Sequence, residues 1–379
     1  MTIEGDHSTQ RPQHPDPAMD RRVRLAVGLL LVASSAHGFI ASPRARLSRT
    51  VRARRNAPRV SADATSDWDL ELYSPAKINL FLRVMKRRDD GFHELASLFQ
   101  TVALGDNLSF SLLPPSATQD QFECDIEGLP TDGSNLVIRA FDLFRLRSGS
   151  SQCFRCRLEK RTPIQAGLGG GSSNAAAALH AANLLCGEPA SDAELIEWSG
   201  ELGSDITFFL GESGSAYCTG RGEIIDPVQP LPTEELFIIK PAAGLSTPLV
   251  FKTLAASGYT SCSSADPKAL LESFTSPSAT PADMYINDLE PPAFECLPAL
   301  DTIKAALLGE FGFPAAMMSG SGTSLFAMGD PQTCRVDEFA DKLVASMAEQ
   351  GISVRVWRTS FLARETDGAR WYVDPHAAR

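Results

Sequence analysis

Four glycines run directly into an alanine-rich segment near the middle of the chain, and this pair of features limits the possible folds most. The glycines lie in the segment 163–173, which reads Pro-Ile-Gln-Ala-Gly-Leu-Gly-Gly-Gly-Ser-Ser. Alanine, the strongest helix former, dominates the stretch from about Ser173 to Cys186. Glycine lets backbone N–H groups converge on an anion, and a helix N-terminus adds unpaired donors. The sequence therefore predicts a phosphate-binding loop, in which Ser172 and Ser173 can cap the helix or reach a phosphate or Mg²⁺.

Two better-known phosphate motifs do not fit this segment. A P-loop of the form GxxxxGK[ST] requires a lysine after the glycines, and none follows them. A dinucleotide-binding fingerprint would have Gly or Ala at position 172, where this chain has Ser, and an acidic residue at the end of a second strand. Glu188 is separated from the glycines by about the number of residues that the fingerprint requires, but it falls in a predicted loop and not at the end of a strand. Because the loop has no lysine of its own, a cation must reach it from another segment.

Lys77 is the candidate for that cation. Small or apolar residues alternate with polar ones from Ala76 to Val84, which predicts a strand with Lys77 and Asn79 on the same face. Phosphoryl transfer also needs a carboxylate that orients the acceptor hydroxyl or accepts its proton. Asp205, between a glycine turn and an apolar run, is the candidate for this group. A helix N-cap is an equally good interpretation of Asp205.

The rest of the pattern indicates mixed helical and strand structure. In chain order it predicts a turn over 87–91, a helix over 135–147, a half-buried strand through Phe154, Cys156 and Leu158, a capping box from Ser191 to Glu194, a hairpin over 215–227, a surface insertion near 257–283 with one short helix at 267–274, and, from Pro298, the order helix, strand, glycine-rich turn, strand, helix and strand. Cys153 and Cys156 form a single CxxC, which we interpret as core or surface cysteines, with a redox role left open.

The first 66 residues have the composition of a targeting leader. A short apolar run follows Arg24 and ends in small residues, which is typical of a signal peptide over about 19–38. No acidic residue occurs from Phe39 to Ala62, where arginines are frequent, so 39–66 reads as a transit-like segment. This order, with Phe39 directly after the small residues, resembles the two-part leader of algae with secondary plastids. The resemblance implies entry into a complex plastid by way of the secretory route, with the stroma as destination. A disordered basic tail would leave the apolar run unexplained.

Net charge argues against nucleic-acid and membrane partners. The whole chain carries −11, but residues 1–66 hold eleven arginines against five acidic residues, which leaves −17 on the remainder. So acidic a body repels phosphate backbones and anionic lipids. An anionic nucleotide therefore has to be bound by local donors rather than by a basic field. The sequence does not indicate an oligomeric state.

Taken together, the motifs resemble those of the GHMP kinase superfamily. The resemblance covers about 72–360 and rests on the segments Pro75–Leu82, Asp90–Gln100, 163–173, Leu202–Asp205, Thr219–Glu223, Asn287–Pro291 and Ser319–Thr323. The first two segments, with Asp205 in register, are similar to the branch that phosphorylates a cytidine-diphosphate-linked methylerythritol in non-mevalonate isoprenoid biosynthesis. The resemblance implies transfer of the γ-phosphoryl group of ATP, with Mg²⁺, to the 2-hydroxyl of that alcohol.

The resemblance also implies a fold and roles for individual residues. The fold would be α+β with two lobes, a ribosomal-S5-like N-terminal lobe over 67–235 and a ferredoxin-like C-terminal lobe over 236–379, and with the active-site cleft between them. Lys77 and Asp205 would be the catalytic pair. The loop Pro163, Ile164, Gln165, Ala166, Gly167, Leu168, Gly169, Gly170, Gly171, Ser172 and Ser173 would hold ATP, and Asn79, Phe92, His93, Phe251, Gly320 and Gly322 would face the cytidine-linked substrate. The Mg²⁺ ligands stay unassigned.

Three positions depart from the pattern of the superfamily branch. Phe92 stands where Tyr is usual, Gln165 replaces a glycine of the loop, and Thr207 replaces a common proline. None of the three removes a reactive group, so we expect altered affinities and retained activity. The competing interpretations are a GHMP kinase for mevalonate, homoserine or a sugar, a catalytically inactive nucleotide-binding regulator, and a structural plastid protein without a ligand.

Overall fold

The computed structural model describes residues 67–87, 93–258, 263–276, 278, 280–364 and 371–377. The predicted leader and most of the predicted turn after Arg87, with Phe92, lie outside these residues. No helix among the described residues has the length and apolar character needed to cross a bilayer. Two sheets and the helices packed on them form the described chain, so the fold is α+β, as expected.

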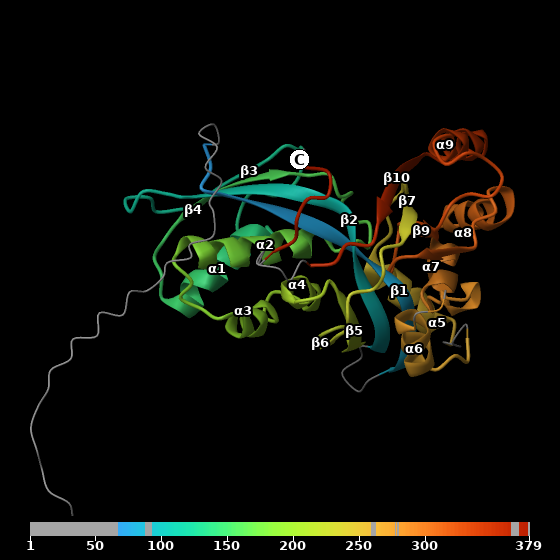
Figure 1. Ribbon diagram of the computed structural model, residues 1–379, viewed down its shortest axis with the longest axis horizontal. Helices are drawn as coiled ribbons and strands as arrows, with labels where there is room; N and C mark the ends of the chain where they lie inside the picture. Colours follow the sequence, from blue (N-terminus) through green and yellow to red (C-terminus); the bar gives the residue numbers. More distant parts are fainter. Residues whose placement is uncertain are drawn as a thin grey trace, which may run out of the picture. The chain divides into compact units, whose positions relative to one another are not determined.

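The first sheet is built around two long antiparallel strands. They are β1 (Leu70–Arg87) and β2 (His93–Leu112), and the sheet order is β3-β4-β2-β5-β6, with β1 against β2. The remaining strands are β3 (Gln121–Cys124), β4 (Phe154–Glu159), β5 (Ser215–Gly220) and β6 (Ile224–Pro227). Figure 1 shows the accompanying helices gathered on one side of these strands: α1 (Leu136–Ser148), α2 (Gly170–Leu185), α3 (Asp192–Ser199) and α4 (Ser204–Leu210).

Helix α2 forms the centre of the first hydrophobic core. Its alanines from Ala175 to Ala178 are fully buried, and their small side chains let the helix lie close to α1 and β1. The predicted start at Ser173 is wrong by three residues, because the helix already begins at Gly170. Gly169, with φ of +67°, turns the chain into the helix, so the last glycines of the loop supply its first turn. The predicted strand face of β4, the capping box at Ser191 and the hairpin β5–β6 are confirmed.

The second sheet has the order β10-β7-β9-β8. Its strands are β7 (Glu235–Pro241), β8 (Ala315–Met318), β9 (Leu325–Met328) and β10 (Val354–Ser360). Its helices are α5 (Thr247–Ala256), α6 (Pro267–Thr275), α7 (Glu290–Cys296), α8 (Ala299–Ala305) and α9 (Phe339–Glu349), with a 3₁₀ turn at Ala282–Met284 and a π turn at Ala306–Glu310. The element order predicted from Pro298 onward is confirmed.

Both faces of the second sheet are buried, and β7 shows how. Phe237 and Ile239 pack on one face with residues of α5, α7, α8 and α9. Leu236 and Ile238 alternate with them and pack on the other face with residues of β1 and β2. The two sheets therefore share one core.

Helix α6 belongs to this shared core. Leu270 and Phe274 are four residues apart and both buried, and the Phe274 ring stacks on Phe81 with 5.9 Å between centroids. The short helix predicted at 267–274 is confirmed as α6, and its burial was not predicted. The signal for burial is the i, i+4 spacing of these two apolar side chains.

Strands β1 and β2 extend into the second half of the chain. Leu82 and Val84, near the end of β1, pack in the core of the second sheet. The Leu82 amide donates to the Ile286 carbonyl at 2.7 Å, and the Asp288 amide donates back to Leu82 at 2.9 Å. One continuous strand thus links both sheets and carries Lys77 between them.

Replacing Phe326 by Ala should destabilise the protein severely. Phe326 is a fully buried residue of β9 in the shared core, and its truncation leaves a cavity. We expect a loss of about 3–5 kcal/mol in the free energy of unfolding, measured by urea titration followed by circular dichroism. Leu146→Ala is the control, because the Leu146 side chain on α1 is 76% exposed; it should change the free energy by about 0.5 kcal/mol or less. Similar losses in both variants would contradict the shared core.

Candidate active site

Lys77 is buried in β1 and surrounded by groups that stabilise its charge. Its ammonium donates to Asn79 Oδ1 at 2.9 Å, lies 3.8 Å from Asp205 Oδ2 and sits 4.1 Å from the centroid of the Phe99 ring. The Lys77 side chain is only 6% exposed. A carboxylate, an amide oxygen and an aromatic face together offset the cost of burying the ammonium.

Asp205 is the second residue of helix α4, whose N-cap is Gly203. The alternative interpretation of Asp205 as the N-cap is therefore wrong. Its side chain is 36% exposed, so one side contacts Lys77 while the rest can meet a ligand.

The glycine-rich loop is attached to β1 and to the loop 319–324 by backbone contacts. The Lys77 amide donates to Leu168 O at 2.9 Å, and Ser319 Oγ donates to Gly167 O at 3.1 Å. A Cβ at Gly167 would lie 2.5 Å from Ser319 O, and one at Gly169 would lie 3.0 Å from the Lys77 side chain. Both residues also have positive φ, so glycine is required at each for two independent reasons.

A buried polar network anchors the base of the loop. Asp106, which is fully buried, accepts from the amides of Arg161 and Thr162 at 2.8 and 2.7 Å, from Lys160 Nζ and from Asn174 Nδ2. Asn174 also donates to Ser74 Oγ, and Ser74 donates to Ser173 Oγ at 2.7 Å. Ser173 is thereby fixed inside the protein, which leaves Ser172 as the partly exposed hydroxyl of the pair.

The sequence analysis missed this network. Asp106 lies in a strand of alternating pattern, far along the chain from the loop, and nothing local distinguishes it from a surface carboxylate.

Two cavities adjoin the loop. One of about 350 Å³ is lined by residues 163–172 together with Asn135, Leu136 and Lys160. Another of about 520 Å³ is lined by Gln165, Gly167, the segment 244–248, Ser321 and Gly322. The first is the size of a small ligand site and presents glycine backbone along one wall.

Among the other predicted substrate residues, His93 and Phe251 stack on each other, whereas Asn79 contacts Lys77. His93, at the start of β2, stacks on Phe251 of α5 with 5.5 Å between ring centroids and an interplanar angle of 25°. Asn79 is 1% exposed, holds Lys77 through its oxygen and donates to Ser97 Oγ at 2.8 Å. Asn79 therefore positions Lys77, and its contact with substrate stays a prediction. Phe92 lies outside the described residues.

Gly320 and Gly322 lie in the turn that faces the glycine-rich loop. A Cβ at Gly320 would lie 3.3 Å from Asn79 Oδ1, and one at Gly322 would lie 2.9 Å from Met318 Sδ. Asn287 Nδ2 holds this turn by donating to the carbonyls of Met318 and Gly320, each at 2.8 Å. Because Gly320 has no side chain, the turn can lie close to Asn79, which binds Lys77.

Two of the three departures have a local explanation. Gln165 has φ of +51°, the left-handed region that favours glycine, so its side chain carries a backbone cost. Thr207 shares a hydrogen bond of 2.9 Å with Ser199 Oγ, which joins α4 to α3. Neither side chain replaces Lys77 or Asp205.

The described residues contain no group of three or more His, Cys, Asp or Glu side chains arranged to hold a metal ion. Mg²⁺ usually keeps several waters and is bound through one or two protein oxygens together with phosphates. Asp205 and Ser172 are partly exposed oxygen donors next to the loop.

Cys156 of the CxxC segment is fully buried, and burial raises the pKa of its thiol well above the ordinary range.

Comparison with known proteins identifies the family of the chain. The chain matches the model of the GHMP kinases N-terminal domain over 135–212 and that of the GHMP kinases C-terminal domain over 270–348. It is 42% identical over 315 residues to a chloroplastic 4-diphosphocytidyl-2-C-methyl-D-erythritol kinase of Arabidopsis thaliana, covering 82% of this chain and 78% of the relative. It is 46% identical over 267 residues to a kinase of that name from Protochlamydia amoebophila (strain UWE25), covering 70% of this chain and 87% of the relative.

A solved structure shows the same fold. The crystal structure of a 4-(cytidine 5'-diphospho)-2C-methyl-D-erythritol kinase superposes with a TM-score of 0.61 at 30% identity, covering 77% of this chain and 99% of the other. The resemblance to the superfamily and its two-lobed α+β fold are thus confirmed. The chain belongs to the 4-diphosphocytidyl-2-C-methyl-D-erythritol kinase family of the GHMP kinases.

Proposed function

We propose that the protein transfers the γ-phosphoryl group of ATP to the 2-hydroxyl of 4-diphosphocytidyl-2-C-methyl-D-erythritol, a step of isoprenoid precursor biosynthesis. The observation that carries the proposal is the 3.8 Å contact between Lys77 Nζ and Asp205 Oδ2, next to a glycine-rich loop bonded to the same strand. A regulator without activity would not need a lysine and a carboxylate held together in this position.

In the proposed step, Asp205 accepts the proton of the acceptor hydroxyl. The hydroxyl oxygen forms a bond to the γ-phosphorus in line with the bridging oxygen, whose bond to that phosphorus breaks, and ADP leaves with the electron pair. Lys77 offsets the negative charge that accumulates on the transferred group. Since oxygen attacks phosphorus directly, no covalent enzyme intermediate is needed.

We propose that ATP is held by the N-terminal lobe, 67–235, and the cytidine substrate largely by the C-terminal lobe, 236–379. The glycine-rich segment 163–171 lines the 350 Å³ cavity, where its backbone N–H groups can bind phosphate oxygens. Mg²⁺ would neutralise phosphate charge there, with Asp205 or Ser172 as its protein ligand. The stacked rings of His93 and Phe251 offer a flat surface for the cytosine base.

Lys77→Ala and Asp205→Asn should each lower kcat by roughly 10²–10⁴-fold, the range for a positioned acid–base or charge-stabilising group. Turnover is measured by mass spectrometry of the phosphorylated product, and circular dichroism reports folding. Lys342→Ala is the matched control, because Lys342 is an exposed lysine of α9 paired with Glu338 and should keep normal turnover. A folded variant of Lys77 or Asp205 with near-normal turnover would remove that residue from the mechanism.

Phe251→Ala should weaken binding of the cytidine substrate about 5- to 150-fold, because stacking of one base contributes roughly 1–3 kcal/mol. Affinity for ATP should hardly change, and Phe92→Ala is predicted to behave in the same way. Calorimetric titration with each ligand makes the measurement. Leu249→Ala, an exposed apolar residue of the same helix, is the control. Equal losses for ATP and the cytidine compound would contradict the assigned pocket.

We further propose that residues 1–66 direct the protein to a plastid, and that they do so through the secretory route. The chloroplastic designation of the plant relatives supports the destination. The route rests on the apolar run before an acid-free, arginine-rich stretch.

A fusion of residues 1–66 to a fluorescent protein should reach the plastid of an alga with complex plastids. Deletion of 19–38 should leave the fusion in the cytosol, because the first membrane crossing requires the signal segment. Fluorescence microscopy of both fusions is the measurement. Plastid import that survives the deletion would disprove the two-step route and leave the kinase assignment untouched.

A further inference from the structure

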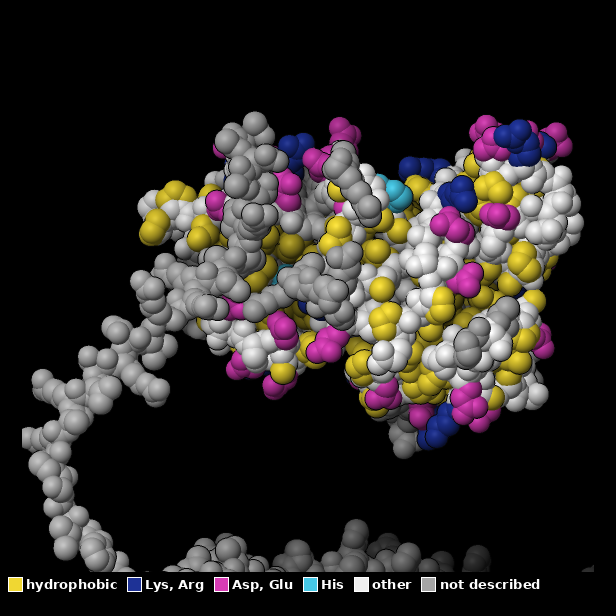
Figure 2. Space-filling view, viewed as in Figure 1, with side chains coloured by type: hydrophobic (Ala, Val, Ile, Leu, Met, Phe, Trp, Pro, Cys, Tyr) yellow, Lys and Arg dark blue, Asp and Glu magenta, His cyan; other side chains and the backbone are white. Residues whose placement is uncertain are grey.

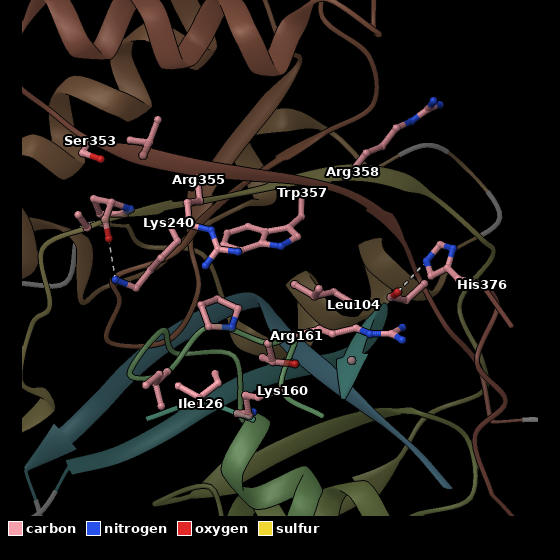
Figure 3. Close-up of a pocket in the computed structure, with 18 of the residues that line it drawn as sticks. Leu104, Ile126, Lys160, Arg161, Lys240, Ser353, Arg355, Trp357, Arg358 and His376 are labelled. Carbon is pink, nitrogen blue, oxygen red and sulfur yellow. Dashed lines mark hydrogen bonds between the residues drawn. The ribbon is translucent and has the colours of Figure 1, made fainter. Parts of the chain in front are cut away.

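A third cavity, of about 790 Å³, lies next to the segment that leads into the glycine-rich loop. It shares Lys160, Pro163 and Ile164 with the cavity beside the loop, but its other walls are different. They come from residues 103–105 of β2, the end of β7, strand β10 and His376 (Figure 3). The catalytic pair and the stacked rings of the acceptor site do not line this cavity.

Basic side chains dominate the polar part of its lining, which includes no aspartate or glutamate among the described residues. The basic residues are Lys160, Arg161, Lys240, Arg355 and Arg358. Figure 2 shows Lys or Arg side chains close to a histidine near β10, on a body with many acidic groups. Since the chain outside 1–66 carries −17, such a concentration of positive charge is a local exception.

Three of these cations already have carboxylate partners. Lys160 pairs with the buried Asp106, and Arg161 lies 3.6 Å from Asp374. Arg358 lies 3.3 Å from Glu235, and it extends away from the other basic residues in Figure 3. Lys240 and Arg355 form no ion pair with any carboxylate of the described chain. Their charges are therefore the ones available to a ligand.

Lys240 and Arg355 are direct cross-strand partners in the antiparallel pair β7–β10. They thus project from the same face of the sheet, where opposed like charges destabilise a strand pair. Figure 3 shows both, with Trp357, on the same wall of the cavity. The positive charges of Lys240 and Arg355 therefore repel each other, and an anion bound to both would replace this repulsion with attraction.

Lys240 is also unusually buried for a lysine without an acidic partner. It is 9% exposed and follows Leu236 and Ile238 on the face that packs against β1 and β2. Its ammonium donates to Pro241 O at 2.7 Å and to Ala243 O at 3.0 Å, and a third N–H remains for a ligand. Burial lowers the pKa of Lys240, as expected for an ammonium without a counter-ion.

An aromatic and apolar surface lies beside these charges. The Arg355 guanidinium sits 4.8 Å from the centroid of Trp357, and Leu104, Ile126 and Ile164 supply further apolar wall. A ligand that fits has an anionic group for the two cations and a flat or apolar part for the tryptophan.

We propose that this cavity is a binding site for an organic phosphate, separate from the sites of the phosphoryl donor and acceptor. Lys240 and Arg355 bind the phosphate oxygens, and Trp357 with its apolar neighbours binds the organic part. The site explains why two like charges are kept opposite each other, one of them buried.

Phenyl phosphate and inorganic phosphate are the probes, titrated by calorimetry into the full chain with the loop saturated by a non-hydrolysable ATP analogue. Phenyl phosphate should bind, and more tightly than inorganic phosphate. Lys240→Met and Arg355→Gln should each weaken its binding at least about 10-fold, since hydrogen bonds to charged groups contribute about 1.5–3 kcal/mol. Trp357→Leu should remove the difference between the two probes. Arg358→Gln, a basic residue of the same strand, should leave the affinity unchanged.

Without a phosphate probe, Lys240→Met should raise the midpoint of thermal unfolding, because it removes the repulsion from Arg355. Added phenyl phosphate should raise the midpoint of the wild type and not that of this variant. Absence of phenyl phosphate binding to the wild type would overturn the proposal. So would affinities that Lys240→Met and Arg355→Gln leave unchanged, or that Arg358→Gln lowers equally. The ATP analogue serves only to block the loop, and the thermal measurements use only the variants and the probes, so the test stands even if the kinase assignment fails.

Discussion

The buried carboxylate of Asp106 is the interaction on which the site depends. From its place in strand β2 it accepts from two backbone amides, an ammonium and a side-chain amide, which come from two other parts of the chain: the segment before the glycine-rich loop and helix α2. A fully buried carboxylate is tolerated only when such donors satisfy it. Because the donors come from the two ends of the loop, satisfying the charge also fixes both ends of the loop. The loop can then contain glycines and still hold one shape.

The proposed site has no lysine in the loop itself. The cation comes from β1, and the Lys77 amide bonds to Leu168 while its ammonium contacts Asp205. One residue therefore connects the loop, the strand and the carboxylate. Glycine at 167 and 169 follows from the same arrangement, since any side chain would collide with Ser319 or with Lys77 itself. In the proposed mechanism the reactive side chains thus come from strand β1 and helix α4, and the loop supplies backbone donors.

Much of this was predictable from the sequence, and the rest was not, for physical reasons. Strand periodicity put Lys77 and Asn79 on one face, and both side chains meet there. The start of α2 was misplaced because glycine has a low helix propensity, which the left-handed cap at Gly169 overrides. The burial of α6 and the Asp106 network depend on partners distant in the chain. A sequence pattern records which residues are apolar or charged, and it does not record which distant residue each will contact.

The last described segments of the chain close onto the first strands. Leu362 bonds to Thr101 of β2, and the Trp371 indole donates to Tyr73 O at 2.7 Å and stacks on His180 of α2. Strand β10 likewise completes a sheet that begins with β7. Folding therefore cannot finish until these last segments have left the ribosome. If the chain crosses a membrane channel, folding likewise cannot finish until they have passed through it. Until the final residues arrive, the apolar face of β1 and β2 lacks its cover, and a fold with such distant pairings forms slowly. Chaperone capture would be needed most during that interval.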